Sequence, residues 1–398
     1  MFAHHPARSK RTIPSIVLAA GLLAACLGAP RAALRTVNLQ AGTLVGYDSN
    51  PLRLADNRTA AVFSELRLDS VADLDFNESA GFFIELHGSL RLHERTTGGA
   101  DYQQVNLRAG FDWMPYRSPS RQIAVALGGL YRSRRTTFLD PATGQDYVLV
   151  EDPAATPPTT INLAQRLDLD STGAFMNMRW KASRRLQFAL DTEFRRDDHR
   201  QDYRESAVVS SLDARRFMVV PGAAITLHNL ARLRLAVGVT RLNYDERPSL
   251  DRQGNEVPGT TRTYDYTTYR LALDLLPAPR WDLRLGMLQT ARDDTFAGYY
   301  TFKQRTVWMS VRRPVGRIHQ WQGYLSLSDL NYATATVTGD PAGEVLSSEV
   351  LQFVGRYQRK VASAWTLFVE GGYQKSTNPD PVYAYDRDWS LVGITFRH

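Results

Sequence analysis

Segments in which apolar and polar side chains alternate recur along most of the chain. In residues 82–93, FFIELHGSLRLH, every even position is apolar or glycine, and the odd positions from 85 onward are Glu, His, Ser, Arg and His. Side chains of a strand point alternately to its two faces, so this segment predicts a strand with one apolar and one polar face. A soluble, half-buried sheet can contain such a strand too. What matters is whether the pattern repeats.

The alternation does repeat, at 62–76, 105–113, 123–131, 186–195, 233–240, 269–275, 281–287 and 365–374. Short connections such as 77–79 alternate with long polar ones such as 134–162 and 244–262. Outer-membrane barrels have short turns on one rim and long loops on the other, whereas a soluble sandwich has no reason to sort its loops by length. The pattern therefore predicts an all-β fold, a closed antiparallel transmembrane β-barrel over residues 34–398, with about sixteen strands (roughly fourteen to eighteen).

A closed barrel also satisfies the backbone in hydrocarbon, where every polar group must be bonded within the protein. An even number of strands returns both termini to the short-turn, periplasmic rim. The last strand, 389–398, has Phe396 near its end and is similar to the terminal signal of outer-membrane barrels. Aromatic residues near the connections predict two girdles at the lipid headgroups: Tyr47, Trp113, Tyr131, Trp180, Tyr244, Trp281, Trp321, Tyr332, Tyr357, Trp365, Tyr373 and Trp389.

The N-terminus has the features of a secretory signal. Basic residues within 8–11 precede the apolar run 16–25, which is too short to span a bilayer comfortably. Residues 23–26 match a lipobox, in which Cys26, the only cysteine, would be acylated after cleavage. Ordinary cleavage near Ala32 or Ala33 is the alternative, and it would discard Cys26. We assign 1–33 to a signal peptide and leave both cleavage sites open.

The remaining sequence features argue against several classes of function. The net charge of +7 comes from 48 basic and 41 acidic residues without a run of like charges, so we expect no nucleic-acid partner. No phosphate loop or Cys/His cluster is present, and we expect no cofactor. Glu85, His87 and Ser89 share one face, but residues two apart on a strand are neighbours by default, so we expect no enzyme. His87 and His93 lie about 20 Å apart, too far to share a metal ion.

The charged residues of the polar faces are the candidate functional residues, because these faces would line a watery lumen. Opposite charges on adjacent strands can pair and stiffen the wall. Guanidinium groups that stay unpaired suit hydroxyl-rich or acidic solutes. The candidates are Glu65, Arg67, Asp69, Glu85, His87, Arg91, Arg108, Asp112, Arg132, Asp191, Glu193, Arg195, Arg232, Arg234, Arg270, Asp274, Asp282, Arg284, Arg356 and Glu370.

Two short motifs add a resemblance to a known group. GYDSNP at 46–51 and YAYDRDW at 383–389 resemble segments of Gram-negative outer-membrane barrels of the β-barrel porin type, including barrels found with exopolysaccharide secretion machinery. The chain is also similar to the barrel half of surface-lipoprotein assembly modifiers. Those proteins, and several polysaccharide-export barrels, carry helical repeats, and this chain has no such repeat period. The resemblance extends over 36–398 and implies passage of a polymer or solute, with no catalytic residue to carry over.

These observations lead to expectations about function and partners. We expect a channel in the Gram-negative cell outer membrane that passes a hydrophilic solute, with polysaccharide secretion as the leading case. The partners would be outer-membrane lipid, the barrel-assembly machinery, periplasmic secretion components and polysaccharide. The alternative is a structural or assembly barrel with a plugged lumen. Loop 134–162 contains the apolar run 147–150, which either folds into the mouth or forms an external β-hairpin.

Overall fold

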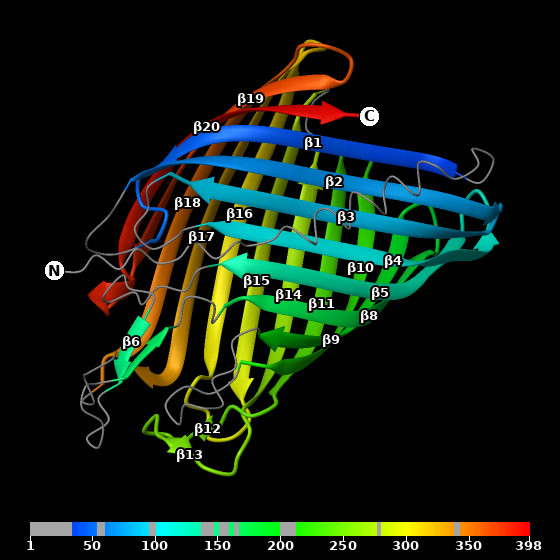
Figure 1. The fold of residues 1–398 in the computed structure, drawn as a ribbon. Helices are drawn as coiled ribbons and strands as arrows, with labels where there is room; N and C mark the ends of the chain where they lie inside the picture. Colours follow the sequence, from blue (N-terminus) through cyan, green and yellow to red (C-terminus); the bar gives the residue numbers. More distant parts are fainter. Residues whose placement is uncertain are drawn as a thin grey trace.

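The computed structural model describes residues 34–53, 60–94, 101–136, 147–150, 159–162, 167–199, 212–276, 280–337 and 343–398. Sixteen strands within these residues form one closed antiparallel barrel (Figure 1). The predicted fold class and strand number are therefore confirmed. The signal peptide at 1–33, with its lipobox cysteine Cys26, lies outside the described residues and stays a prediction.

The barrel strands follow one another in chain order, and each pairs with the next. Their bounds in the first half are β1 (Leu34–Asp48), β2 (Ala61–Asn77), β3 (Ala80–His93), β4 (Tyr102–Arg117), β5 (Gln122–Thr136), β8 (Leu169–Lys181), β9 (Leu186–His199) and β10 (Ala214–His228). Those in the second half are β11 (Ala231–Tyr244), β14 (Thr263–Leu275), β15 (Asp282–Asp294), β16 (Phe302–Val315), β17 (His319–Thr336), β18 (Val345–Lys360), β19 (Trp365–Thr377) and β20 (Tyr385–Arg397).

The barrel closes where its first and last strands pair. The ladder between β1 and β20 runs from Gln40 opposite Arg397 to Asp48 opposite Trp389. Beyond it, the backbone N–H of His398 donates to the carbonyl of Leu39 at 2.8 Å. The start of β1 and the end of β20 therefore both lie at the rim that carries the short turns, as the even strand number predicts (Figure 1).

Within the described residues, the long connections contain two short β-hairpins and one 3₁₀ turn. Tyr147–Val150 (β6) pairs with Thr159–Asn162 (β7), and Ser249–Leu250 (β12) pairs with Glu256–Val257 (β13). A 3₁₀ turn, η1, covers Pro381–Tyr383. The run 147–150 thus forms a β-hairpin, the second of the two readings of loop 134–162, and Figure 1 draws β6 beyond the long-loop end of the barrel.

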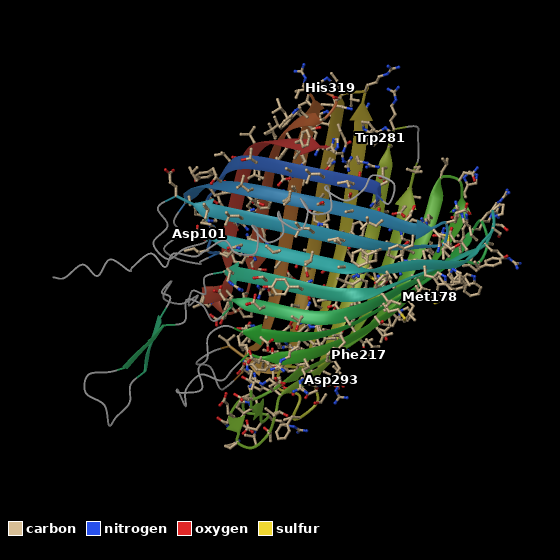
Figure 2. All side chains as sticks on the ribbon, turned by 45° about the vertical axis from the view of Figure 1, so that its right-hand side comes forward. Asp101, Met178, Phe217, Trp281, Asp293 and His319 are labelled. Carbon is tan, nitrogen blue, oxygen red and sulfur yellow. The ribbon has the colours of Figure 1, made fainter. Side chains whose placement is uncertain are left out.

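One face of the wall exposes large apolar side chains from strand to strand. On β11 these are Leu235, Val237 and Val239, which alternate with residues of the opposite face. Near the short turns the exposed set is aromatic: Phe111, Trp113, Trp180, Trp281, Trp321 and Trp365. Figure 2 shows Trp281 near this end and Asp293 near the other. A closed barrel with an apolar outer face and an aromatic girdle belongs in the outer membrane of a Gram-negative cell. None of the described residues belongs to a helix long and apolar enough to cross a bilayer.

Three aromatic residues assigned to the girdles lie instead on the inner face. Trp389 packs against Leu44 and its neighbours inside the barrel, and Tyr244 packs against the buried Leu242. Tyr332 lies 5.7 Å from the guanidinium of Arg292, which shares the inner face. The distance of a residue from the end of its strand sets its depth in the membrane, but its place in the alternation sets which face it lies on. These three residues have the depth expected for a girdle but lie on the inner face.

Candidate functional site

The inner face of the barrel collects the charged residues that the alternation singled out. Strand register places all of the predicted lumen residues on the face opposite the exposed apolar side chains. Most of them form cross-strand contacts of opposite charge. The candidate functional site is therefore the inner wall itself, and its chemistry depends on how these charges are matched.

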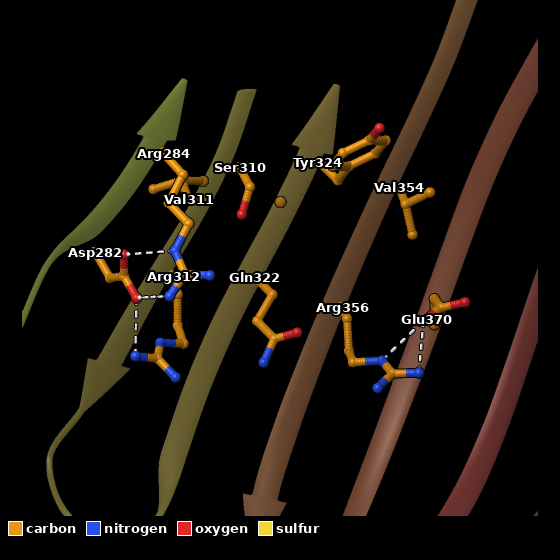
Figure 3. Close-up of a pocket in the computed structure, with 11 residues that line it drawn as sticks. Asp282, Arg284, Ser310, Val311, Arg312, Gln322, Tyr324, Val354, Arg356 and Glu370 are labelled. Atoms are coloured by element: carbon orange, nitrogen blue, oxygen red, sulfur yellow. Dashed lines mark hydrogen bonds and ion pairs between the residues drawn. The ribbon is translucent and has the colours of Figure 1, made fainter. Parts of the chain in front are cut away.

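One wall, between β15 and β19, contains a hollow of about 400 Å³ (Figure 3). Arg312 donates to Asp282 at 2.8 Å, and Arg284 approaches the same carboxylate at 3.3 Å. On the far side of the hollow, the Arg356 Nε donates to Glu370 at 2.8 Å. The hollow is therefore lined by guanidinium groups that are held in place by acids.

The charged side chains on the inner face of β2 to β4 are also paired with opposite charges. Arg91 contacts Glu65 at 2.7 Å, and the His87 Nδ1 lies 2.8 Å from an oxygen of Asp69. Arg108 lies 3.6 Å from Glu85. His87 therefore takes part in a cross-strand polar pair, which accounts for its place on this strand without a catalytic role. No group of three or more possible metal ligands occurs in the described part of the chain.

A repeated unit, not anticipated from the sequence, lies on both sides of the β1–β20 seam. On β2, Phe63 precedes Glu65 by two residues, and Arg91 on the next strand bonds Glu65 while its guanidinium lies 4.4 Å from the Phe63 ring. On β19, Phe368 precedes Glu370 in the same way, and Arg356 lies 4.6 Å from the Phe368 ring. The aromatic-x-Glu spacing is visible in the sequence, but the arginine opposite requires the strand register.

The two rings of this unit meet in an apolar cluster on the inner wall. Leu44, Phe63, Phe368 and Leu391 are all at most 5% exposed and pack together, with Trp389 against them. Gly46 and Gly393 leave room for the rings, since a Cβ on either glycine would come within 2.6 Å of the ring opposite it. The rings thus lie flat on neighbouring backbone instead of projecting across the lumen.

Near the long-loop rim, Arg292 is surrounded by aromatic rings. Its guanidinium lies 4.3 Å from the ring of Phe302 and 4.5 Å from that of Tyr264, and its Nε donates to the carbonyl of Tyr300 at 2.9 Å. Arg262, nearly fully buried, donates to the carbonyl of Pro248 at 3.0 Å. Arg292 on β15 therefore fastens the connection 295–301 to the inner wall, and Arg262 joins two parts of the connection 245–262 to each other.

Some inner-face arginines have no carboxylate partner among the residues that the structure describes. Arg132 donates to the amide oxygen of Asn106 at 2.8 Å, and Arg232 donates to the amide oxygen of Gln187. Arg270, in the middle of β14, is exposed and makes no ion pair or side-chain hydrogen bond with the residues that the structure describes. These guanidinium groups keep their charge available to a solute, which the sequence alone could not show.

Comparisons with known proteins add little about function. No family model matches the chain, and no curated protein matches it. Among solved structures, OmpT of Vibrio cholerae in its trimer form is 8% identical, with 91% of this chain and 99% of that chain covered and a TM-score of 0.46. An anion-selective porin from Comamonas acidovorans is 13% identical, with 91% and 99% covered and a TM-score of 0.42. A structure described as a bacterial polysaccharide outer membrane secretin is 9% identical, with 91% and 98% covered and a TM-score of 0.45. Likeness at this level assigns neither a family nor a function.

Proposed function

We propose that the protein is an outer-membrane channel for a hydrophilic solute. The observation that carries this proposal is the inner wall, which pairs most of its charges and still leaves hollows lined by arginine, asparagine and carboxylate side chains. A small barrel that is filled by its own side chains points its large residues into the interior. Here the large rings near the seam lie flat against glycine backbone, which keeps them off the axis.

The unpaired arginines give the channel a preference for anions. Arg132, Arg232 and Arg270 contribute positive charge that no carboxylate of the described residues neutralises at ion-pair distance. A low-dielectric wall focuses such charge into the lumen, which raises the local concentration of anionic solutes.

Polysaccharide is the solute class that fits these groups best. A sugar ring offers hydroxyl groups to amides and carboxylates and an apolar face to flat side chains, and the wall holds both kinds of partner around Phe175 and Asn177. Passage of a polymer also calls for periplasmic secretion components as partners. The rival function is a structural or assembly barrel with a plugged lumen. The aromatic residues around Arg292 are the part of the inner wall that favours this alternative.

Planar-bilayer recording of the refolded barrel tests the channel. Large, steady conductance steps are the expected result, and a barrel that stays silent across a range of voltages supports the plugged alternative.

A separate experiment tests polysaccharide as the solute. Deletion of the gene should lower the amount of surface or secreted polysaccharide, and restoration of the gene on a plasmid should bring it back. Unchanged polysaccharide together with an open channel would point to a general solute pore.

A further inference from the structure

Buried polar atoms without a hydrogen-bond partner gather on one part of the inner wall. They include the Nε atoms of Arg134 and Arg216, the Oγ of Ser171 and the Nδ1 of His199. These residues lie on β5, β8, β9 and β10, which are neighbours in the barrel. A buried donor without a partner is costly, so the two arginine Nε atoms and the Ser171 hydroxyl in one place indicate a site where a ligand supplies the missing acceptors.

The register brings these groups to adjacent positions at the long-loop half of the strands. Leu169 on β8 lies opposite both Arg134 and His199. Ser171, two residues along β8, lies opposite Arg132 and Asp197. Arg195 and Arg216 face each other across the next ladder. Four arginines therefore share one area of the wall.

The acids in this area do not balance the four arginines. Arg195 takes the two nearest carboxylates, at 3.4 Å from Glu193 and 2.7 Å from Asp197. Arg216 approaches Asp197 only to 3.9 Å. Arg132 is close enough to interact with the like charges of Arg195 and Arg216 and with the same two carboxylates, Glu193 and Asp197. Like charges held together on a rigid wall are costly, and an anion among them would offset that cost.

A hollow of about 290 Å³ has one of these arginines, Arg132, in its lining. Arg132 lines it together with Asn106, Glu193, Phe175 and Met218. Its volume is close to the lower end of small-molecule sites, and its lining mixes amide, carboxylate and apolar surfaces. Such a lining suits a sugar ring, whose hydroxyl groups and apolar face need those partners. Arg134 comes two residues after Arg132 on β5, and Arg216 two residues before Met218 on β10, so both share the face of a residue that lines the hollow.

We propose that Arg132, Arg134 and Arg216 bind an oxyanion group, such as a carboxylate or a phosphate ester, carried by a sugar unit that occupies this hollow. The site rests on the proposed function for the sugar and narrows it to acidic saccharides. Guanidinium forks match the geometry of both oxyanions, which is why either group fits. The binding itself does not depend on whether the barrel conducts.

Calorimetric titration of the full-length barrel in detergent tests the site. The probes are trigalacturonate for a carboxylate, glucose 6-phosphate for a phosphate ester, and maltotriose for a neutral sugar. The wild-type barrel should bind an acidic probe and should bind maltotriose at least about tenfold more weakly. R132Q/R134Q should weaken binding of the acidic probe by about tenfold or more, and R241Q, which changes an arginine of the outer face, should leave that binding unchanged.

Several results would overturn the proposal. Equal affinity for trigalacturonate and maltotriose would show that the site does not recognise an anion. Unchanged binding of the acidic probe by R132Q/R134Q would show that these arginines do not bind it. If inorganic phosphate binds as tightly as glucose 6-phosphate, the sugar unit does not contribute to binding. If R132Q/R134Q does not fold, as judged by its mobility on unheated gels, R216Q takes its place with the same expected loss. A silent barrel that still binds the acidic probe contradicts the channel but supports this site.

Discussion

Trp308 lies over Gly286 on the inner wall, with the two residues directly opposite each other on β16 and β15. A Cβ at Gly286 would overlap the indole ring. The same arrangement joins Trp389 to Gly372 on β20 and β19. Each glycine is the surface on which a large ring rests, so the ring covers backbone and does not stand up in the lumen.

Gly286→Ala should therefore destabilise the barrel, because the new methyl group forces the Trp308 ring out of its place. Overpacking of this kind costs about 1–3 kcal/mol. Denaturant unfolding followed by tryptophan fluorescence measures the change. Gly371→Ala is the matched control, since a Cβ there meets its nearest neighbour, the carbonyl of Trp389, at an ordinary 3.6 Å. Equal stability of the two variants would contradict the packing described.

Asp48→Asn should destabilise the closure of the barrel. The Asp48 carboxylate is fully buried and accepts from the Arg387 Nε at 2.9 Å, which joins β1 to β20. The amide would leave the guanidinium of Arg387 without its counter-charge, at a cost of about 3–5 kcal/mol. Asp265→Asn is the control: its ion pair with Arg241, at 3.7 Å, is half exposed, so its loss should change little. The midpoint of guanidinium unfolding in detergent compares the two.

Arg270→Glu should shift the ion selectivity of the channel towards cations. Arg270 faces the lumen at mid-strand without an ion pair among the described residues, so reversal of its charge acts on passing ions directly. The reversal potential across a salt gradient in planar bilayers reports this shift. Arg241→Glu makes the same change of charge on the outer face and should leave the reversal potential as it is. A shift of equal size in both variants would show that overall charge, not the lumen position, sets selectivity.

Acidification should loosen the turn of the β12–β13 hairpin. The Asp251 carboxylate accepts from the backbone N–H groups of Asn255 and Gln253, each at 2.9 Å, and from the side-chain amide of Asn255. These hydrogen bonds, with those of Asn255 first, lower the pKa of Asp251 below its usual 3.8. Because the folded pKa is the lower one, the stabilisation is fully present above pH 3.8 and is lost as the pH falls through the folded value.

Hydrogen exchange of the amides at 253–255, measured from pH 6 down to about 3 and corrected for intrinsic rates, checks this expectation. Protection should fall in the acid range for the native chain. Asp251→Asn, which has no carboxylate to titrate, should show weaker protection that does not change with pH. A native chain whose protection stays constant down to the lowest pH would refute the assignment.

Much of the fold follows from the sequence because the side chains of a strand alternate between its two faces, and this alternation is visible in the order of the residues. The alternation of Leu235, Val237 and Val239 with their neighbours assigns the outer face, and the sorted loop lengths assign the neighbours of each strand. Both predictions need only local information. The charged lumen residues followed from the same alternation.

What the sequence did not reveal depends on the register between strands. Gly46 meets the Phe63 ring only because those two residues are opposite each other, and a shift of two positions would pair each with a different residue. The same holds for Arg132 beside Ser171, and hence for the group of unpartnered donors. Trp389 was assigned to the membrane girdle by its nearness to a connection, although its odd position places it on the inner face, opposite the exposed Val392.

The pairing of β1 with β20 makes barrel formation depend on the end of the polypeptide. Until Tyr385–Arg397 has arrived, both β1 and β19 present unpaired backbone groups, which hydrocarbon does not tolerate. The chain therefore cannot be inserted strand by strand as it emerges. Its two free edges stay unpaired until the thirteen residues of β20 pair with β1 on one side and with β19 on the other, which closes the cylinder.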